Sequence, residues 1–145
     1  MLFNGFSYGD ELRTLVVSSW VSKVAVLGFV RDHLVYQQRI LSQLVSVVMD
    51  GRDIGTVVFP DADFKFFLIA DAEIRAKRRY DELKAKGEEV VLEDILKNVI
   101  DRDHQDSTRL ISPLKKAEDA LEIDTTNVSI ETTLVLMFSK INSKY

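Results

Sequence analysis

Apolar side chains recur every four residues through the first part of the chain, which is the spacing of one face of an α-helix. The series predicts a helix from residue 10 or 11 to residue 27, and it consists of Leu12, Val16, Trp20 and Val24. Gly28 then interrupts the pattern, and a second helix is predicted over residues 29–41. Residues 1–9 form a short aromatic stretch that contains two glycines, so they fit a strand remnant and a turn.

Three short apolar runs predict β-strands, at residues 44–49, 65–70 and 120–124. Helices are predicted between and after them: over residues 72–86, closed by Gly87; over residues 92–109, before Pro113; and through residue 138 after a Ser129 cap. Because strands and helices alternate, we expect one α/β unit with a parallel sheet flanked by helices.

Charge gathers directly after the first predicted strand, in the string D-G-R-D at positions 50–53. In open parallel sheets, ligands bind beyond the carboxyl ends of the strands, and a guanidinium between carboxylates suits a phosphate together with a base edge. An ion-paired turn that merely ends the strand explains the same string equally well on spacing alone.

Two helical groups of arginines are further candidates. Arg75, Arg78 and Arg79 share a helix face, which suits either a polyphosphate or plain solvent. Arg102 and Arg109 flank Asp106 along one helical edge, where a surface ion-pair network would add only about 0.3 to 0.5 kcal/mol per pair. Binding of a ligand explains the second group better than stability does, and the alternative is an ordinary exposed helix end.

Composition narrows the class of protein. The 145 residues are 46% hydrophobic and 29% charged, which is ordinary for one globular domain. A net charge of -4 argues against a nucleic-acid or membrane-surface protein, no apolar run is long enough to span a bilayer, and the absence of cysteine suits a cytoplasmic setting. The residues therefore indicate an anion-binding α/β domain, without histidine patterns for a triad or a metal site.

Several strings together resemble bacterial cytidylate kinase over essentially the whole chain. The most specific is M-D-G-R-D-I-G-T-V-V-F-P at 49–60. The others occur in the same order and at the same spacings as in that family: E-L-R-T at 11–14, S-K-V-A at 22–25, V-R at 30–31, Q-Q-R at 37–39, R-A-K-R-R-Y at 75–80, R-D-H-Q-D at 102–106 and R-L-I-S-P-L at 109–114.

The resemblance implies a P-loop nucleoside monophosphate kinase fold and an ATP- and Mg²⁺-dependent phosphoryl transfer to CMP or dCMP. It implies that residues 1–43 belong to the monophosphate-binding insert and connecting helices. Residues 44–145 would form the C-terminal part of the kinase core, with a lid region at about 78–109.

The same resemblance implies roles for individual residues. It implies that Ser22, Arg31 and Asp53 contact the cytosine base. Arg52 and Arg109 would hold the CMP phosphate and Arg102 and Asp106 would lie near the sugar, with the three arginines as the catalytic cations. Arg78 would face the ATP phosphates from the lid, and no metal ligand is assigned.

One family feature is missing from these residues. The chain contains no Walker-type glycine loop, neither G-x-x-x-x-G-K-[ST] nor the family's own version, and Gln105 stands where many members carry arginine. We therefore expect a partial fold whose parallel sheet lacks its P-loop strand, with an N-terminal segment missing and weak or no activity alone. The alternative is a non-catalytic nucleotide-binding or interaction half-domain.

Overall fold

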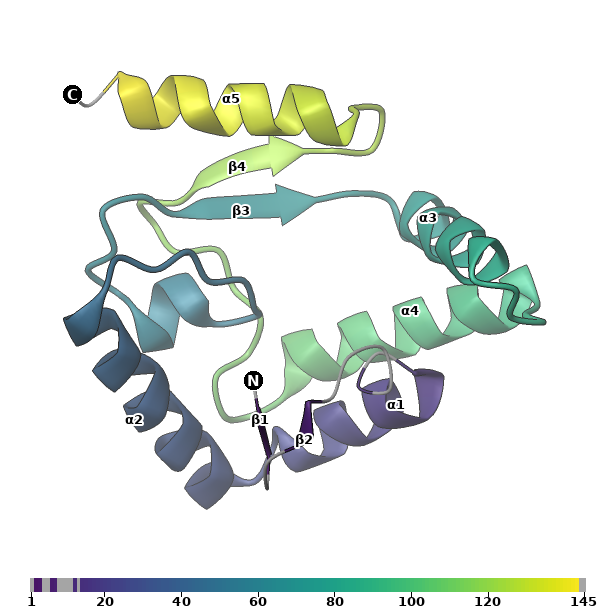
Figure 1. Cartoon of the computed structure of the whole chain (residues 1–145), viewed down its shortest axis with the longest axis horizontal. Helices are drawn as coiled ribbons and strands as arrows, with labels where there is room; N and C mark the ends of the chain where they lie inside the picture. Colours follow the sequence, from purple (N-terminus) through teal and green to yellow (C-terminus); the bar gives the residue numbers. More distant parts are fainter. Residues whose placement is uncertain (1, 4–5, 8–11, 13, 144–145) are drawn as a thin grey trace.

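The computed structural model describes residues 2–3, 6–7, 12 and 14–143, and it confirms an α/β chain (Figure 1). In chain order its elements are β1 (Leu2–Phe3), β2 (Phe6–Ser7), α1 (Leu15–Val24), α2 (Gly28–Leu44), the π-helical turn η2 (Ile54–Val58), β3 (Phe66–Ile69), α3 (Ala72–Ala85), α4 (Leu92–Thr108), β4 (Leu121–Asp124) and α5 (Ile130–Asn142).

The parallel sheet consists of β3 and β4, which pair from Phe66 opposite Leu121 to Ile69 opposite Asp124. The chain travels from one strand to the other through α3 and α4, which is the long crossover that parallel pairing requires. Backbone hydrogen bonds extend the ladder at both ends, from the Leu121 N–H to the Lys65 carbonyl (2.9 Å) and from the Thr125 N–H to the Ile69 carbonyl (2.7 Å). The strands predicted at residues 65–70 and 120–124 are therefore confirmed, with ends that differ from the prediction by at most one residue.

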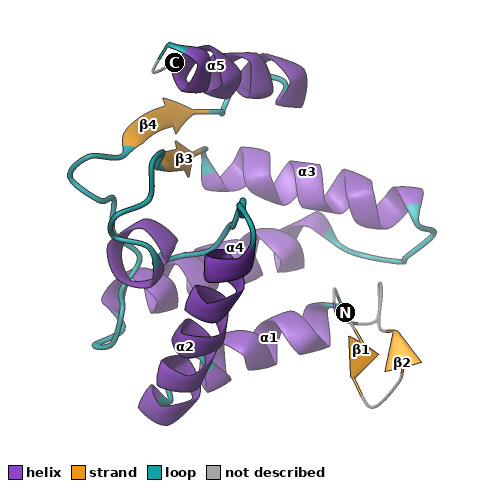
Figure 2. Ribbon diagram, turned by 60° about the vertical axis from the view of Figure 1, so that its left-hand side comes forward, coloured by secondary structure: helices purple, strands orange, loops and turns teal. Residues whose placement is uncertain are grey.

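Helices α3 and α4 form a hairpin with its own hydrophobic core. Ala76, Leu83 and Ile95 are almost completely buried between the two helices, and partly buried apolar side chains from both helices surround them. The turn between them passes through Gly87, whose φ of +81° favours glycine. The hairpin extends from the carboxyl end of β3 and runs back toward α1, which lies beside α4 in both views (Figure 2).

The predicted helix boundaries need adjustment at several ends. Helix α1 begins later than expected because the side chain of Thr14 accepts a hydrogen bond from the Val17 N–H and caps the helix there. Helix α2 begins at Gly28 and continues to Leu44, three residues beyond the predicted end. Helix α5 starts after the Ser129 cap as predicted and extends to Asn142. The aromatic N-terminus contains β1 and β2, which pair as antiparallel strands.

The predicted strand at residues 44–49 is wrong. Leu44 belongs to α2, and residues 46–50 have no regular structure. Most side chains of the run are exposed: Leu44 is 75% exposed and Val48 is fully exposed. A strand of this composition forms only where a neighbouring strand pairs with its backbone, and among the described residues β3 pairs with β4 alone. The apolar run therefore remains extended coil.

Helix α5 lies next to β4 in both views (Figure 2). Several of its apolar side chains are exposed. Ile130, Val135 and Phe138 are each more than half exposed. None of the helices within the described residues is both long and apolar enough to cross a bilayer.

Candidate anion-binding site

The string D-G-R-D-I-G leads into the π-helical turn η2, and its glycines lie at crowded points. A Cβ on Gly51 would lie 2.8 Å from Cγ1 of Ile54, and a Cβ on Gly55 would lie 3.3 Å from Cδ of Lys65. The Lys65 side chain is itself held in place, because its ammonium donates to the Asp119 carboxylate (2.7 Å) and to the Pro60 carbonyl. These contacts place Arg52 and Asp53 at the start of a tightly packed turn.

Asp53 lies between two arginines from distant parts of the chain. Its carboxylate accepts a hydrogen bond from the guanidinium of Arg31, near the start of α2, and lies 3.9 Å from Nη2 of Arg109, directly after α4. All three side chains are nearly buried, with exposed fractions of 8%, 11% and 6%. Burial strengthens each charge interaction because less water screens it.

Asp106 is the second buried carboxylate and has three guanidinium neighbours. Arg52 donates its Nε hydrogen to Oδ2 at 2.8 Å, Arg102 Nε lies 3.7 Å from the same oxygen, and Arg109 Nη1 lies 3.5 Å from Oδ1. Arg102 precedes Asp106 by one helical turn of α4, and Arg109 follows it at the end of that helix. Arg109 contacts both carboxylates and so links the two halves of the site.

The six side chains form what we call the arginine cluster: Arg31, Arg52, Asp53, Arg102, Asp106 and Arg109. Four guanidinium groups face two carboxylates, so this set carries two positive charges in excess. Burial, together with the neighbouring Arg52, lowers the pKa of Arg102 below its ordinary value. Burial, together with Arg31, likewise lowers the pKa of Arg109. Burial is the largest cause of both shifts, and the neighbouring guanidinium groups add to it. The excess of guanidinium groups over carboxylates favours a bound anion.

Donors are also available for such an anion. Within the described residues, Nε of Arg31 and Nη2 of Arg109 are buried and have no hydrogen-bond acceptor. Buried donors normally find one, so these N–H groups are suited to the oxygens of a ligand. The Ser112 carbonyl accepts the Nε hydrogen of Arg109 at 2.6 Å and so orients its guanidinium, and Ser112 adopts a positive φ of 51° in the loop that makes this possible.

Comparison with known proteins adds an independent observation. A family model described as cytidylate kinase matches residues 1–143. The chain belongs to the cytidylate kinase family. It is 57% identical over 127 residues to the cytidylate kinase of Bacteroides fragilis, 48% identical over 142 residues to that of Flavobacterium johnsoniae, and 48% identical over 141 residues to that of Thermosipho melanesiensis.

These alignments cover most of this chain but only part of each relative. They include 88%, 98% and 97% of this chain, and 56%, 62% and 65% of the respective cytidylate kinase. The chain therefore spans about six tenths of the length of these relatives.

The structure brings together six of the eight side chains that the cytidylate kinase resemblance singled out, namely the arginine cluster. The ion pairs of Arg52 and Asp53 reach across the fold instead of closing a local turn. The side chain of Ser22 lies outside the described residues. Arg78 lies apart from the cluster, because its guanidinium donates to the carbonyl of Thr125 at 2.5 Å in the loop after β4.

Arg75, Arg78 and Arg79, which share one face of α3, do not form a common ligand-binding site in this structure. Arg75 makes a paired contact with the Asp103 carboxylate (3.0 and 2.6 Å), and Arg79 donates to Glu82 on its own helix at 2.7 Å. Arg78, as described above, contacts the loop after β4. Each member of the trio thus has a different protein partner.

Two contacts near the site were not predicted from the sequence. Arg39 on α2 donates to two carbonyls of η2, and Lys65 pairs with Asp119 beside the same turn. The Q-Q-R string marked Arg39 as part of a family pattern, but helical spacing alone gives no sign of a partner on another element. Lys65 appears in the sequence as an ordinary polar start to β3.

The described residues offer no group of three or more His, Asp or Glu side chains that could hold a metal ion. The two carboxylates of the arginine cluster are already occupied by guanidinium groups. These residues do not fit a Mg²⁺ site, and the sequence contains no glycine loop for a triphosphate.

Proposed function

We propose that this chain carries the acceptor side of a (d)CMP kinase, which transfers a phosphoryl group from ATP to CMP or dCMP and yields CDP or dCDP. The observation that supports this most is the arginine cluster, in which four guanidinium groups, two of them nearly buried, face two buried carboxylates and two N–H groups lack acceptors. A nucleoside monophosphate supplies the compensating anion, and membership of the cytidylate kinase family names its base.

The phosphate is proposed to lie against Arg52 and Arg109, with Arg102 and Asp106 near the sugar. Phosphoryl transfer needs little covalent help from protein, so catalysis consists mainly of aligning donor and acceptor and placing cations where negative charge develops. The three arginines are suited to both tasks because Asp106 already holds their guanidinium groups within one small region. Asp106 would then orient the cations and lie near the sugar.

The base is proposed to lie against Arg31 and Asp53, with Ser22 as a third contact. Cytosine carries an exocyclic amine that donates hydrogen bonds and a ring edge that accepts them. A carboxylate beside a guanidinium offers the matching acceptor and donor, and both of these side chains are nearly buried, so a mismatch would be costly. Uracil presents an acceptor in place of the amine and would face the Asp53 carboxylate with like polarity.

The ATP side is proposed to belong to the part of the relatives' sequence that this chain does not match. In this proposal a P-loop strand would pair with β3 on the edge away from β4 and would let residues 44–49 join the sheet. Residues 1–43 would then serve as the monophosphate-binding insert, residues 44–145 as the C-terminal part of the core, and residues 78–109 as the lid, with Arg78 turned toward the ATP phosphates. The exposed apolar side chains of Leu44 and Val48 support a missing neighbour.

The same exposed side chains also favour the second candidate, a half-domain that binds nucleotide or a partner without transferring phosphate. Calorimetric titration with CMP separates these cases in two steps. We expect wild-type chain to bind CMP more tightly than UMP, and Arg52→Ala to weaken CMP binding by about tenfold, since a hydrogen bond to a charged group contributes roughly 1.5 to 3 kcal/mol. Lys97→Ala, which removes an exposed charge on α4, serves as the control and should bind normally.

A well-folded chain without CMP affinity would contradict the acceptor site and favour the interaction half-domain. A coupled assay with ATP, Mg²⁺ and CMP then tests the missing ATP side. Turnover equal to that of a full-length relative, measured in parallel, would show that the phosphate cradle lies within these residues after all.

A further inference from the structure

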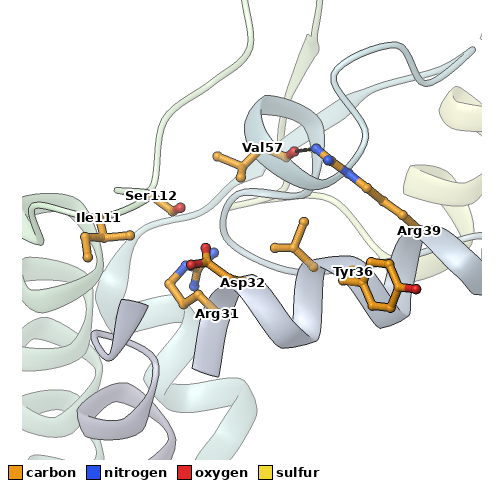
Figure 3. Close-up of a pocket in the computed structure, with 8 residues that line it drawn as sticks. Arg31, Asp32, Tyr36, Arg39, Val57, Ile111 and Ser112 are labelled. Carbon is orange, nitrogen blue, oxygen red and sulfur yellow. Dashed lines mark hydrogen bonds between the residues drawn. The ribbon is translucent and has the colours of Figure 1, made fainter. Parts of the chain in front are cut away.

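Arg39 connects helix α2 to the π-helical turn η2 although it has no place in the arginine cluster. Its Nε hydrogen goes to the Val58 carbonyl at 2.9 Å, and its Nη2 group donates to the Val57 carbonyl at 2.7 Å. Figure 3 shows the side chain reaching from α2 to the turn, with the dashed line ending on Val57. Two adjacent carbonyls thus accept hydrogen bonds from one guanidinium group.

The turn itself explains why these carbonyls need outside donors. At its start, the Asp53 carbonyl accepts the N–H groups of Val57 (2.8 Å), Thr56 (3.3 Å) and Val58 (3.3 Å), and the Ile54 carbonyl accepts that of Phe59 (2.7 Å). The last carbonyls of any helical segment lack partners within the segment. Arg39 supplies these partners at the end of η2, where a positive charge is also favoured.

Helix α2 therefore holds η2 at both ends. Near the beginning of α2, Arg31 pairs with the Asp53 carboxylate, which immediately precedes the turn. Eight residues later on the same helix, Arg39 binds the carbonyls at the end of the turn. Both arginines line one cavity of about 330 Å³ between α2, η2 and the loop at Ile111 and Ser112 (Figure 3).

We propose that Arg39 is a positioning residue for acceptor recognition: it fixes η2 against α2 and thereby fixes the direction of the Asp53 carboxylate, without touching the nucleotide. This inference rests on the proposed function for its consequence, but the anchoring itself rests only on the contacts above. Because the planar guanidinium serves two neighbouring carbonyls at once, a lysine at this position keeps the charge and reaches one of them.

The test compares the wild-type chain with Arg39→Ala, Arg39→Lys and the charge-matched control Lys97→Ala. Hydrogen exchange of the Val57 and Phe59 amides, followed by NMR, measures the anchoring. We expect Arg39→Ala to speed their exchange by about tenfold, which corresponds to roughly 1.4 kcal/mol, while amides in the α3–α4 hairpin keep their protection. Arg39→Lys should give an intermediate rate and Lys97→Ala the wild-type rate.

The ratio of UMP to CMP dissociation constants, measured by calorimetry on the same proteins, tests the consequence. We expect the ratio to fall several-fold in Arg39→Ala and less in Arg39→Lys, because a loosened turn no longer presents Asp53 in one direction. Faster exchange with an unchanged ratio would overturn the positioning role, and unchanged exchange would overturn the anchoring. If Arg39→Ala loses its helical circular dichroism, the Arg39→Lys comparison decides the same question.

A wild-type chain that binds no CMP overturns the proposed function by itself. In that case the exchange measurement still decides the anchoring, since it needs no nucleotide. The two failures are therefore distinguishable.

Discussion

Removing the buried carboxylate of Asp106 should destabilise the chain far more than removing an exposed one. Its side chain is 5% exposed and has three guanidinium neighbours, the nearest being Nε of Arg52 at 2.8 Å. Without it, Arg109, whose side chain is 6% exposed, remains beside Arg31 and Arg52 with less compensating charge. Breaking a buried ion pair from one side costs about 3 to 5 kcal/mol. We expect Asp106→Ala to lower the free energy of unfolding by about this amount.

Asp106→Asn separates the charge from the shape of this side chain. The amide oxygen can still accept from Arg52, so we expect a loss smaller than that of Asp106→Ala, about 2 kcal/mol. The matched control is Asp81→Ala, because Asp81 pairs with Lys77 at 2.6 Å but is 58% exposed. A pair of that kind contributes at most about 0.5 kcal/mol.

Urea unfolding followed by far-ultraviolet circular dichroism measures all three variants. The reasoning is refuted if Asp106→Ala costs no more than Asp81→Ala. Added sulfate gives a second readout, because an anion should recover part of the loss in Asp106→Asn by replacing the missing charge. The sulfate response of Asp81→Ala corrects for the general stabilising effect of the salt.

Three further predictions concern single features of the fold. The hydrogen bond from Lys65 lowers the pKa of Asp119 below its ordinary value of 3.8. The stabilisation by this carboxylate is therefore present at neutral pH and is lost as the pH falls through the lowered pKa. Urea midpoints of Asp119→Asn and wild type should differ at neutral pH and converge in strong acid. Gly87→Ala should lower the free energy of unfolding by about 1 kcal/mol, because Gly87 has a φ of +81° even though a Cβ there would meet no neighbour. Gly28→Ala should not lower it, because a Cβ on Gly28 would make only ordinary contacts. Equal urea midpoints for the two variants would contradict this. Ser129→Ala should cost about 1 kcal/mol of helix stability, seen as faster amide exchange confined to the first turn of α5, and unchanged exchange there would show that the cap is idle.

Local signals in the sequence were reliable where an element needs no distant partner. The crossover helices α3 and α4 lie within one residue of their predicted spans, because Gly87 and the apolar spacing are properties of the segment itself. Residues 44–49 show the opposite case. Their composition is that of a buried strand, but a strand exists only when another strand accepts its hydrogen bonds, and spacing within the run carries no information about that neighbour.

The candidate site divides in the same way. The one-turn spacing of Arg102 and Asp106 predicted that they share an edge of α4, and they do. Family resemblance, not spacing, connected these residues with Arg31 and Asp53. The contacts of Arg39 with η2 and of Arg78 with the loop after β4 could not be predicted either, since each joins residues that lie far apart along the chain.

The amino-acid sequence by itself determined the α/β class, the order of the main elements and the family, because helix periodicity, caps and specific strings are local properties. Tertiary structure alone decided which charges meet. The two carboxylates become buried, the pKa values of Arg102 and Arg109 fall, and four guanidinium groups gather around those carboxylates only when α2, η2 and α4 pack together. The physical reason is that electrostatic energy depends on distances in space and on exclusion of water, and neither is written in the spacing of residues along a chain.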